Sequence, residues 1–154
     1  MRNRRNQPPS EVPQLEEFLC FAIYSANHAF NRVYQPLLKA LDLTYTQFLA
    51  MILLWEEDGQ TVGDLGKKLS LQSNTLTPML KRLETFGYVT RSRSSADERQ
   101  VRIHLTVAGR DLQHRASDVV RNVRKATGLK DKPNKALKES VDALRKALED
   151  HSSR

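Results

Sequence analysis

The stretch TVGDLGKKLSLQSNTLTPMLKRLETFG, residues 61–87, decides how this chain folds. Its first ten residues predict a short helix with Thr61 as the N-cap. The next few residues make a tight turn, and residues 74–87 predict a second helix, capped by Ser73 and ended by Gly87. Two short helices joined by a tight turn predict a helix-turn-helix.

The residues after this stretch change from the period of a helix to that of a strand. Residues 88–90 and 101–105 are short runs with alternate apolar side chains, joined by a polar and charged segment. A β-hairpin with a basic tip directly after a helix-turn-helix makes a winged helix-turn-helix. We therefore expect a mainly α fold with a small β-hairpin.

Amphipathic helices are expected on both sides of this winged part. Pro36 is best placed at the first position of a short helix, where its missing N–H costs nothing. The last helix carries a heptad-like apolar seam, more than an isolated surface helix needs. Apolar stripes at both chain ends predict a homodimer with an intertwined helical interface. Flanking helices are expected at residues 14–34, 36–41, 45–57, 106–126 and 134–150.

A chain of 154 residues is most simply one domain. We expect a flexible basic arm over residues 1–13 and a single domain over residues 14–150. Within that domain, residues 43–110 form the DNA-binding winged helix, and residues 14–42 and 111–150 supply the N- and C-terminal dimerisation helices.

Composition limits the cellular setting and the partner. A net charge of +7 favours a polyanionic partner, with nucleic acid first. A single cysteine fits a reducing compartment, and no apolar run approaches the roughly 18 residues of a membrane span. The first residues lack the apolar core of a signal peptide. We expect a cytoplasmic protein without a membrane partner.

The second helix of the helix-turn-helix carries the candidate DNA-reading face. Small hydrogen-bonding side chains near its start, with a cation one turn later, suit entry into the major groove. In the wing, the Asp97 carboxylate can aim the Arg99 guanidinium at a narrow minor groove, unless the two form only a surface ion pair. The predicted DNA-binding residues are Ser73, Asn74, Thr75, Thr77, Lys81, Arg82, Asp97 and Arg99.

Cys20 is the only cysteine of the chain and lies in the first amphipathic helix. Tyr24 is one turn further along the same face, so its ring can lie beside the sulfur. Tyr34 is fourteen residues on, about 21 Å away along a straight helix, and should not reach Cys20 within one subunit. It could do so across a two-fold axis on which the first helices cross antiparallel. The alternative is that Cys20 is an inert small apolar residue.

The wing sequence DERQVRIHLT, residues 97–106, resembles the D-x-R-x-x-x-x-x-L-T signature of MarR-type transcription regulators. The order and lengths of the expected elements extend this resemblance over residues 14–150. Residues 43–84 resemble more narrowly the OhrR branch, the thiol-based sensors of organic hydroperoxides. QSN at residues 72–74 departs from the D-S-G expected of that branch, which leaves the operator sequence open.

The resemblance implies roles for the thiol and three tyrosines. Cys20, Phe21 and Tyr24 match the C-F-x-x-Y motif that holds the peroxidatic cysteine. Tyr34 and Tyr45 match in spacing the tyrosines that hydrogen-bond this sulfur from the other subunit. Phenol donors favour the thiolate over the thiol.

The implied function is a repressor that releases a pseudo-palindromic operator of double-stranded DNA when organic hydroperoxide oxidises Cys20 to a sulfenic acid. Because no second cysteine is present, the sulfenic acid would then either form a mixed disulfide with a small thiol or be overoxidised. Neither enzymatic activity, a cofactor nor a metal is implied, since the four histidines are scattered.

Three other functions remain open at this stage. The first is a MarR-type repressor released by a small phenolic or lipophilic ligand in the dimer crevice. The second is a thiol peroxidase that uses Cys20, although no resolving cysteine is present. The third is an architectural DNA-binding protein without a switch.

Overall fold

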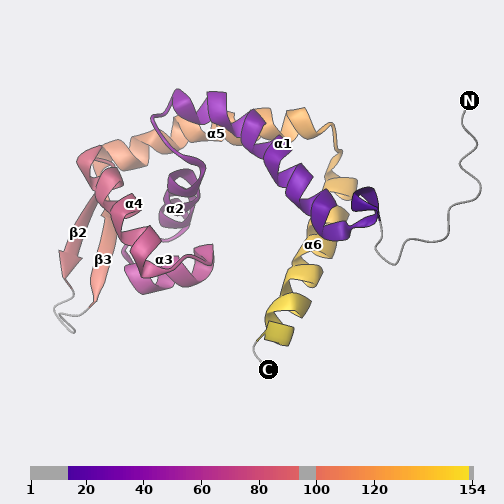
Figure 1. Cartoon of the computed structure of the whole chain (residues 1–154). Helices are drawn as coiled ribbons and strands as arrows, with labels where there is room; N and C mark the ends of the chain where they lie inside the picture. The colour runs from indigo at the N-terminus through magenta and orange to yellow at the C-terminus, as the bar shows by residue number, and fades with distance from the viewer. Residues whose placement is uncertain (1–13, 94–99, 153–154) are drawn as a thin grey trace, which may run out of the picture.

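The computed structural model describes residues 14–93 and 100–152, which form a winged-helix half and a pair of helical arms (Figure 1). Within these residues, six α-helices, one short 3-10 helix and a three-stranded sheet are present. None of the described helices is long and apolar enough to cross a membrane. The elements are η1 (Leu15–Glu17), α1 (Leu19–Lys39), α2 (Tyr45–Glu56), β1 (Gln60–Thr61), α3 (Val62–Leu69), α4 (Ser73–Thr85), β2 (Val89–Arg93), β3 (Val101–Leu105), α5 (Val107–Thr127) and α6 (Asp131–Ser152).

The winged-helix half has its own apolar core. Helices α2, α3 and α4 pack against the sheet, and the apolar face of each helix is removed from water, which is the main stabilising term of such a unit. The helix-turn-helix and the hairpin that the sequence predicts are confirmed. The largest fully buried side chains are Phe48, Met51, Leu54, Leu65, Leu76, Leu80, Leu83, Val89 and Ile103.

The sheet contains one strand more than the predicted hairpin. β3 pairs antiparallel with β2, with Val89 opposite Leu105, and on its other edge with the two-residue β1, where Gln60 lies opposite Ile103. A run of two residues is too short to show a strand period, so the sequence did not reveal it. The added strand fixes the start of α3 to the wing.

Several predicted helix boundaries differ from the observed ones, since α1 starts at Leu19 rather than at residue 14 and α6 at Asp131 rather than at residue 134. Two further differences have a physical cause in the fold. Pro36 lies inside α1 and does not begin a second helix. It removes the hydrogen bond to the Arg32 carbonyl, which costs about 3 kcal/mol in a helix interior. The helix continues to Lys39 because Leu38, two residues after Pro36, is buried in the core, and burying a leucine contributes about 1.5–3 kcal/mol.

The other wrong boundary is the start of α4. The N-cap is Gln72, without a side-chain capping bond, and Ser73 is already the first helical residue. The Gln72 carbonyl accepts from the backbone N–H groups of both Thr75 and Leu76, so the helix starts one residue earlier than the serine suggested. At the other end, Gly87 has φ +74°, as the predicted helix stop requires.

The helical arms consist of the first part of α1 and all of α6 (Figure 1). Among the described residues, α6 has no buried side chain and α1 has only Leu38. Helix α5 links the two parts: it packs against α1, and its Gly109 carbonyl accepts from the Trp55 indole N–H of α2 over 2.8 Å. Large apolar side chains exposed on η1, α1 and α6 are Leu15, Leu19, Ile23, Tyr24, Phe30, Leu137, Val141 and Leu148.

Candidate DNA-binding surface and thiol site

Helix α4 presents a polar face to the outside and an apolar face to the core. Leu76, Leu80 and Leu83 are fully buried, and Asn74 and Lys81 are exposed on the opposite side. At 100° per residue, Asn74 and Lys81 lie within about 20° of each other around the helix axis. The described face therefore has the form that the sequence predicts for a helix that enters the major groove.

The other predicted residues of α4 divide into two groups. Ser73 and Thr75 are exposed in the first turn, and Thr77 is half-buried on the side that faces the wing. Arg82 is exposed but lies about 80° around the helix from Asn74, on the flank that faces α1 and α2. The structure thus does not bring Arg82 to the same face as Lys81. Asp97 and Arg99 lie outside the described residues.

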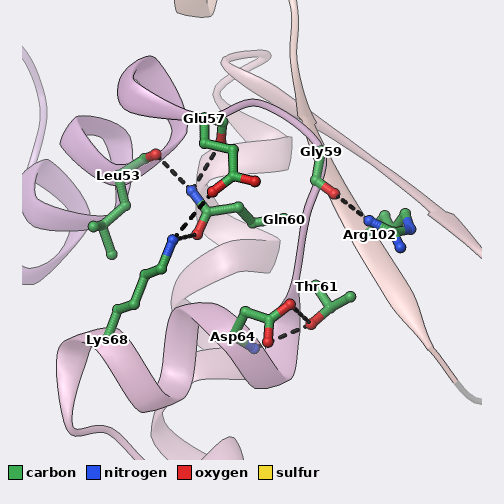
Figure 2. Close-up of polar contacts among 8 residues, drawn as sticks. All are labelled: Leu53, Glu57, Gly59, Gln60, Thr61, Asp64, Lys68 and Arg102. Atoms are coloured by element: carbon green, nitrogen blue, oxygen red, sulfur yellow. Dashed lines mark hydrogen bonds and ion pairs between the residues drawn. The ribbon is translucent and has the colours of Figure 1, made fainter.

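A polar network holds α3 and the wing in place relative to α2 (Figure 2). The side-chain amide of Gln60, only 5% exposed, donates to the carbonyls of Leu53 and Glu57 over 2.6 and 2.8 Å. Its oxygen accepts from Lys68 Nζ over 2.7 Å. Arg102 Nη1 donates to the Gly59 carbonyl over 2.8 Å, which ties β3 to the same loop. A buried amide with all its groups satisfied fixes one orientation of the helix-turn-helix.

The N-cap of α3 is the predicted Thr61. Its hydroxyl accepts from the Asp64 N–H over 3.0 Å and donates to Asp64 Oδ2 over 2.7 Å. This hydrogen bond to the carboxylate is the main cause that lowers the pKa of Asp64, and the charge of Lys67 acts in the same direction. The carboxylate at the start of α3 is therefore ionised at neutral pH.

Cys20 lies in the first turn of α1 and is exposed. The ring of Tyr24, 59% exposed, is one turn further along, where it contacts the ring of Phe21 at 6.3 Å and that of His28 at 4.3 Å between centroids. The amide dipoles of a first helical turn favour a negative charge. The thiol therefore combines access from solvent with a helix N-terminus, and Tyr24 is one helical turn away.

Tyr34 and Tyr45 lie together, away from Cys20 of the same chain. Their ring centroids are 4.7 Å apart, and the Tyr34 ring also packs 6.1 Å from that of Phe48. Burial raises the pKa of both phenols, and the charge of Tyr45 raises that of Tyr34 further. Both hydroxyls therefore remain protonated at neutral pH and are able to donate hydrogen bonds. Along α1, Tyr34 is about 21 Å from Cys20, so only Tyr24 of the three predicted tyrosines is near this thiol.

A cavity that the sequence did not reveal lies between α1, α2 and α4. Its volume is about 780 Å³, and both apolar and charged side chains line it. Residues so far apart along the chain give no common pattern in a sequence, so only the fold could assemble them. Residues that line this α1–α4 cavity include His28, Arg32, Lys39, Asp42, Tyr45 and Arg82.

The described residues contain no group of three or more histidine, cysteine, aspartate or glutamate side chains able to hold a metal ion.

Similarity to known proteins identifies the family of this chain. The sequence model of the family described as transcriptional regulator SarA/Rot matches residues 32–116. This chain belongs to that family of MarR-like winged-helix regulators.

Individual relatives of this SarA/Rot family member cover most of its length. The HTH-type transcriptional regulator TtmR of Methylorubrum extorquens is 44% identical over 144 residues, which is 93% of this chain and 74% of the relative. The organic hydroperoxide resistance transcriptional regulator of Bacillus subtilis is 43% identical over 136 residues, 88% of this chain and 90% of the relative. Reduced AbfR bound to DNA is 39% identical with a TM-score of 0.71, covering 84% of this chain and 91% of that one.

These relatives are transcriptional regulators and not enzymes, and the structure of reduced AbfR contains DNA. The chain is accordingly a DNA-binding transcriptional regulator of the OhrR/MarR type, with one cysteine. The fold class and the family resemblance expected from the sequence are confirmed.

Proposed function

We propose that this regulator is a homodimeric repressor that releases its operator when an organic hydroperoxide oxidises Cys20. The observation that carries the proposal is the position of the one thiol. It is exposed in the first turn of α1, beside Tyr24 and among the exposed apolar side chains Leu19 and Ile23. The relative from Bacillus subtilis is named for organic hydroperoxide resistance, which supports the same function.

A homodimer accounts for the apolar face of the arms. The exposed apolar side chains of α1 and α6 are more than a monomer in water would leave uncovered in one region. In a two-fold dimer with antiparallel first helices, the start of one α1 lies near the second half of the other. Tyr34 and Tyr45 of one subunit would then donate to the sulfur of Cys20 in the other.

The chemistry follows from an exposed thiol among apolar side chains. The sulfur attacks one peroxide oxygen, the O–O bond breaks, and the alkoxide leaves as the alcohol after it takes a proton, so that Cys20 becomes a sulfenic acid. A small thiol then displaces the hydroxyl as water and leaves a mixed disulfide. The added group displaces the tyrosine contacts and shifts the two subunits. Two α4 helices that have moved no longer fit half-sites about 34–36 Å apart.

The test is a mobility shift on the DNA upstream of the protein's own gene. It compares reduced protein with protein treated with cumene hydroperoxide and a small thiol. We expect the oxidised wild type to release DNA and to bind again after reduction, and Cys20→Ser to stay bound throughout. The matched control is Cys20→Ser combined with Ser25→Cys, which keeps one exposed thiol on α1 but moves it away from the first turn. Continued binding by a wild type with fully oxidised Cys20 would rule out the thiol switch.

The α1–α4 cavity supports a second candidate. Three cations, Arg32, Lys39 and Arg82, line it together with Tyr45 and the single carboxylate of Asp42, a setting that suits a small phenolic compound in its anionic form. Such a ligand would release DNA without a change at Cys20. Release by a phenol that persists in Cys20→Ser and disappears in Arg32→Gln would establish this alternative.

A further inference from the structure

Arg91 occupies an unusual place in the wing. It lies in β2 directly opposite Ile103 of β3, and residues opposite each other in an antiparallel pair point to the same face of the sheet. Ile103 is fully buried, and so is Val89, two residues before Arg91 on the same face. The strand period therefore directs an arginine toward the core side of the sheet.

One donor of the Arg91 side chain has no partner there. Its Nε is buried, and no hydrogen bond satisfies it. A buried donor without an acceptor is costly, and a charged one more so, which is why such groups in folded proteins call for an explanation. Arg102, the neighbouring wing cation, is by contrast bonded to the Gly59 carbonyl.

Arg91 lines a cleft of about 580 Å³ between α3, the start of α4 and the wing. Lys67 and Arg102 bring two further cations to this cleft, and the carboxylate of Asp64 is already bonded to Thr61. From α4, the cleft receives the side chains of Ser73 and Thr77, which are one turn apart and both carry hydroxyl donors. The lining thus consists largely of donors and positive charge, which suits an oxyanion.

The position of the cleft identifies the oxyanion. When α4 enters a major groove and the wing reaches the adjacent minor groove, the DNA strand between the two grooves passes over the gap between α4 and the wing. We propose that this cleft binds one backbone phosphate of the operator in each half-site, with Arg91 as its main donor. The proposal rests on the DNA binding of this regulator and not on the oxidation of Cys20. It adds a contact that fixes the register of α4 without reading a base.

The test measures how the affinity of reduced protein for duplex DNA depends on salt. Each phosphate contact contributes about 0.9 to the slope of log K against log salt, so Arg91→Gln should lower the slope by about 1.8 in a dimer. The affinity should fall by roughly tenfold per half-site, on specific and random duplexes alike. The control Lys132→Gln removes one charge from α6, far from the cleft, and should leave the slope unchanged. A purely structural role for Arg91 would lower stability but not the slope, and an unchanged slope would refute the proposal.

Phosphate ethylation of the duplex locates the contact. We expect that ethylation of one backbone phosphate in each half-site blocks DNA binding by wild type. Ethylation of the same phosphate should not affect DNA binding by Arg91→Gln. Arg91→Lys is the second variant, for the case that Arg91→Gln folds poorly. It keeps the positive charge, so the slope of log K against log salt should stay the same. The loss of DNA binding caused by phosphate ethylation should be weaker than in wild type. An interference pattern that is the same in wild type and both variants would refute the proposal.

Free phosphate is the other source of the same chemistry. Inorganic phosphate without DNA should not raise the melting temperature more than chloride of equal ionic strength. A rise that is lost in Arg91→Gln would instead assign the cleft to a free anion. Release of DNA on oxidation is expected to persist in Arg91→Gln, so failure of the thiol switch and failure of the phosphate contact are observed separately.

Discussion

Leu80 and Leu148 both lie on the apolar face of an amphipathic helix, yet their environments are opposite. Leu80 of α4 is 0% exposed in the core of the winged-helix half, and Leu148 of α6 is 60% exposed on the arm. The winged half therefore buries most of its large apolar side chains within one chain, while the arms leave theirs uncovered. In the proposed homodimer, the relation between the subunits can therefore change without disturbing the units that bind DNA.

The largest effect is expected where this contrast is most direct. Leu80→Ala should lower the free energy of unfolding by about 2–5 kcal/mol, because it removes buried methyl groups and leaves a cavity. Leu148→Ala should leave the secondary structure unchanged. It should weaken the free energy of dimer association by up to about 2 kcal/mol for each Leu148 side chain that the dimer buries. Urea unfolding and sedimentation at several protein concentrations measure the two effects. Equal losses in both variants, independent of concentration, would show that α6 packs within its own subunit.

A smaller loss of stability is expected from a substitution in the contact between α5 and the winged half. Gly109, in the first turn of α5, has no room for a side chain, because a Cβ there would lie 2.0 Å from the Tyr88 carbonyl oxygen. Gly109→Ala should cost about 1–3 kcal/mol, since α5 or the end of α4 must shift. Gly63→Ala is the matched control, because its Cβ would lie 3.8 Å from the nearest atom, Thr61 Oγ1, and should not destabilise the protein. Thermal unfolding of both variants measures the difference. A Gly109→Ala protein as stable as wild type would mean that α5 is not held rigidly against the wing.

The smallest effect concerns the start of α3, within the winged half alone. Thr61→Ala should cost about 1 kcal/mol through loss of the N-cap. The pKa of Asp64 is lowered in the folded state, so the contribution of its bond to Thr61 is present above the ordinary value of 3.8 and is lost as the pH falls through the folded pKa. The stability difference between wild type and variant should therefore be largest at neutral pH and narrow in acid. If urea unfolding shows the same difference at every pH, Thr61 acts on the backbone N–H alone.

Local signals in the sequence were sufficient for the helices and the hairpin of the DNA-binding half, but not for the two-residue β1. Thr61 and Gly87 act within one turn of the chain, and the leucine spacing of α4 depends only on the helix period, so neighbouring residues carry all the information. Ser73 and Pro36 misled for the same reason. Both have strong local preferences, yet Leu38 and Leu76 are held in the core, and that burial set the helix limits instead.

The sequence by itself determined the winged-helix class, the family and the presence of a single thiol in the first helix, but the structure placed that thiol in the first turn. Only the tertiary structure decided which side chains meet: Tyr34 with Tyr45, Arg82 with the α1–α4 cavity, and Arg91 with the cleft beside α4. The strand period did contain one signal for the last of these, since Arg91 follows buried Val89 by two residues. The physical reason for the division is that helix, strand and cap preferences act between neighbours in the chain. Cavities and charge clusters arise from residues that are distant in sequence and become close only when apolar burial folds the chain.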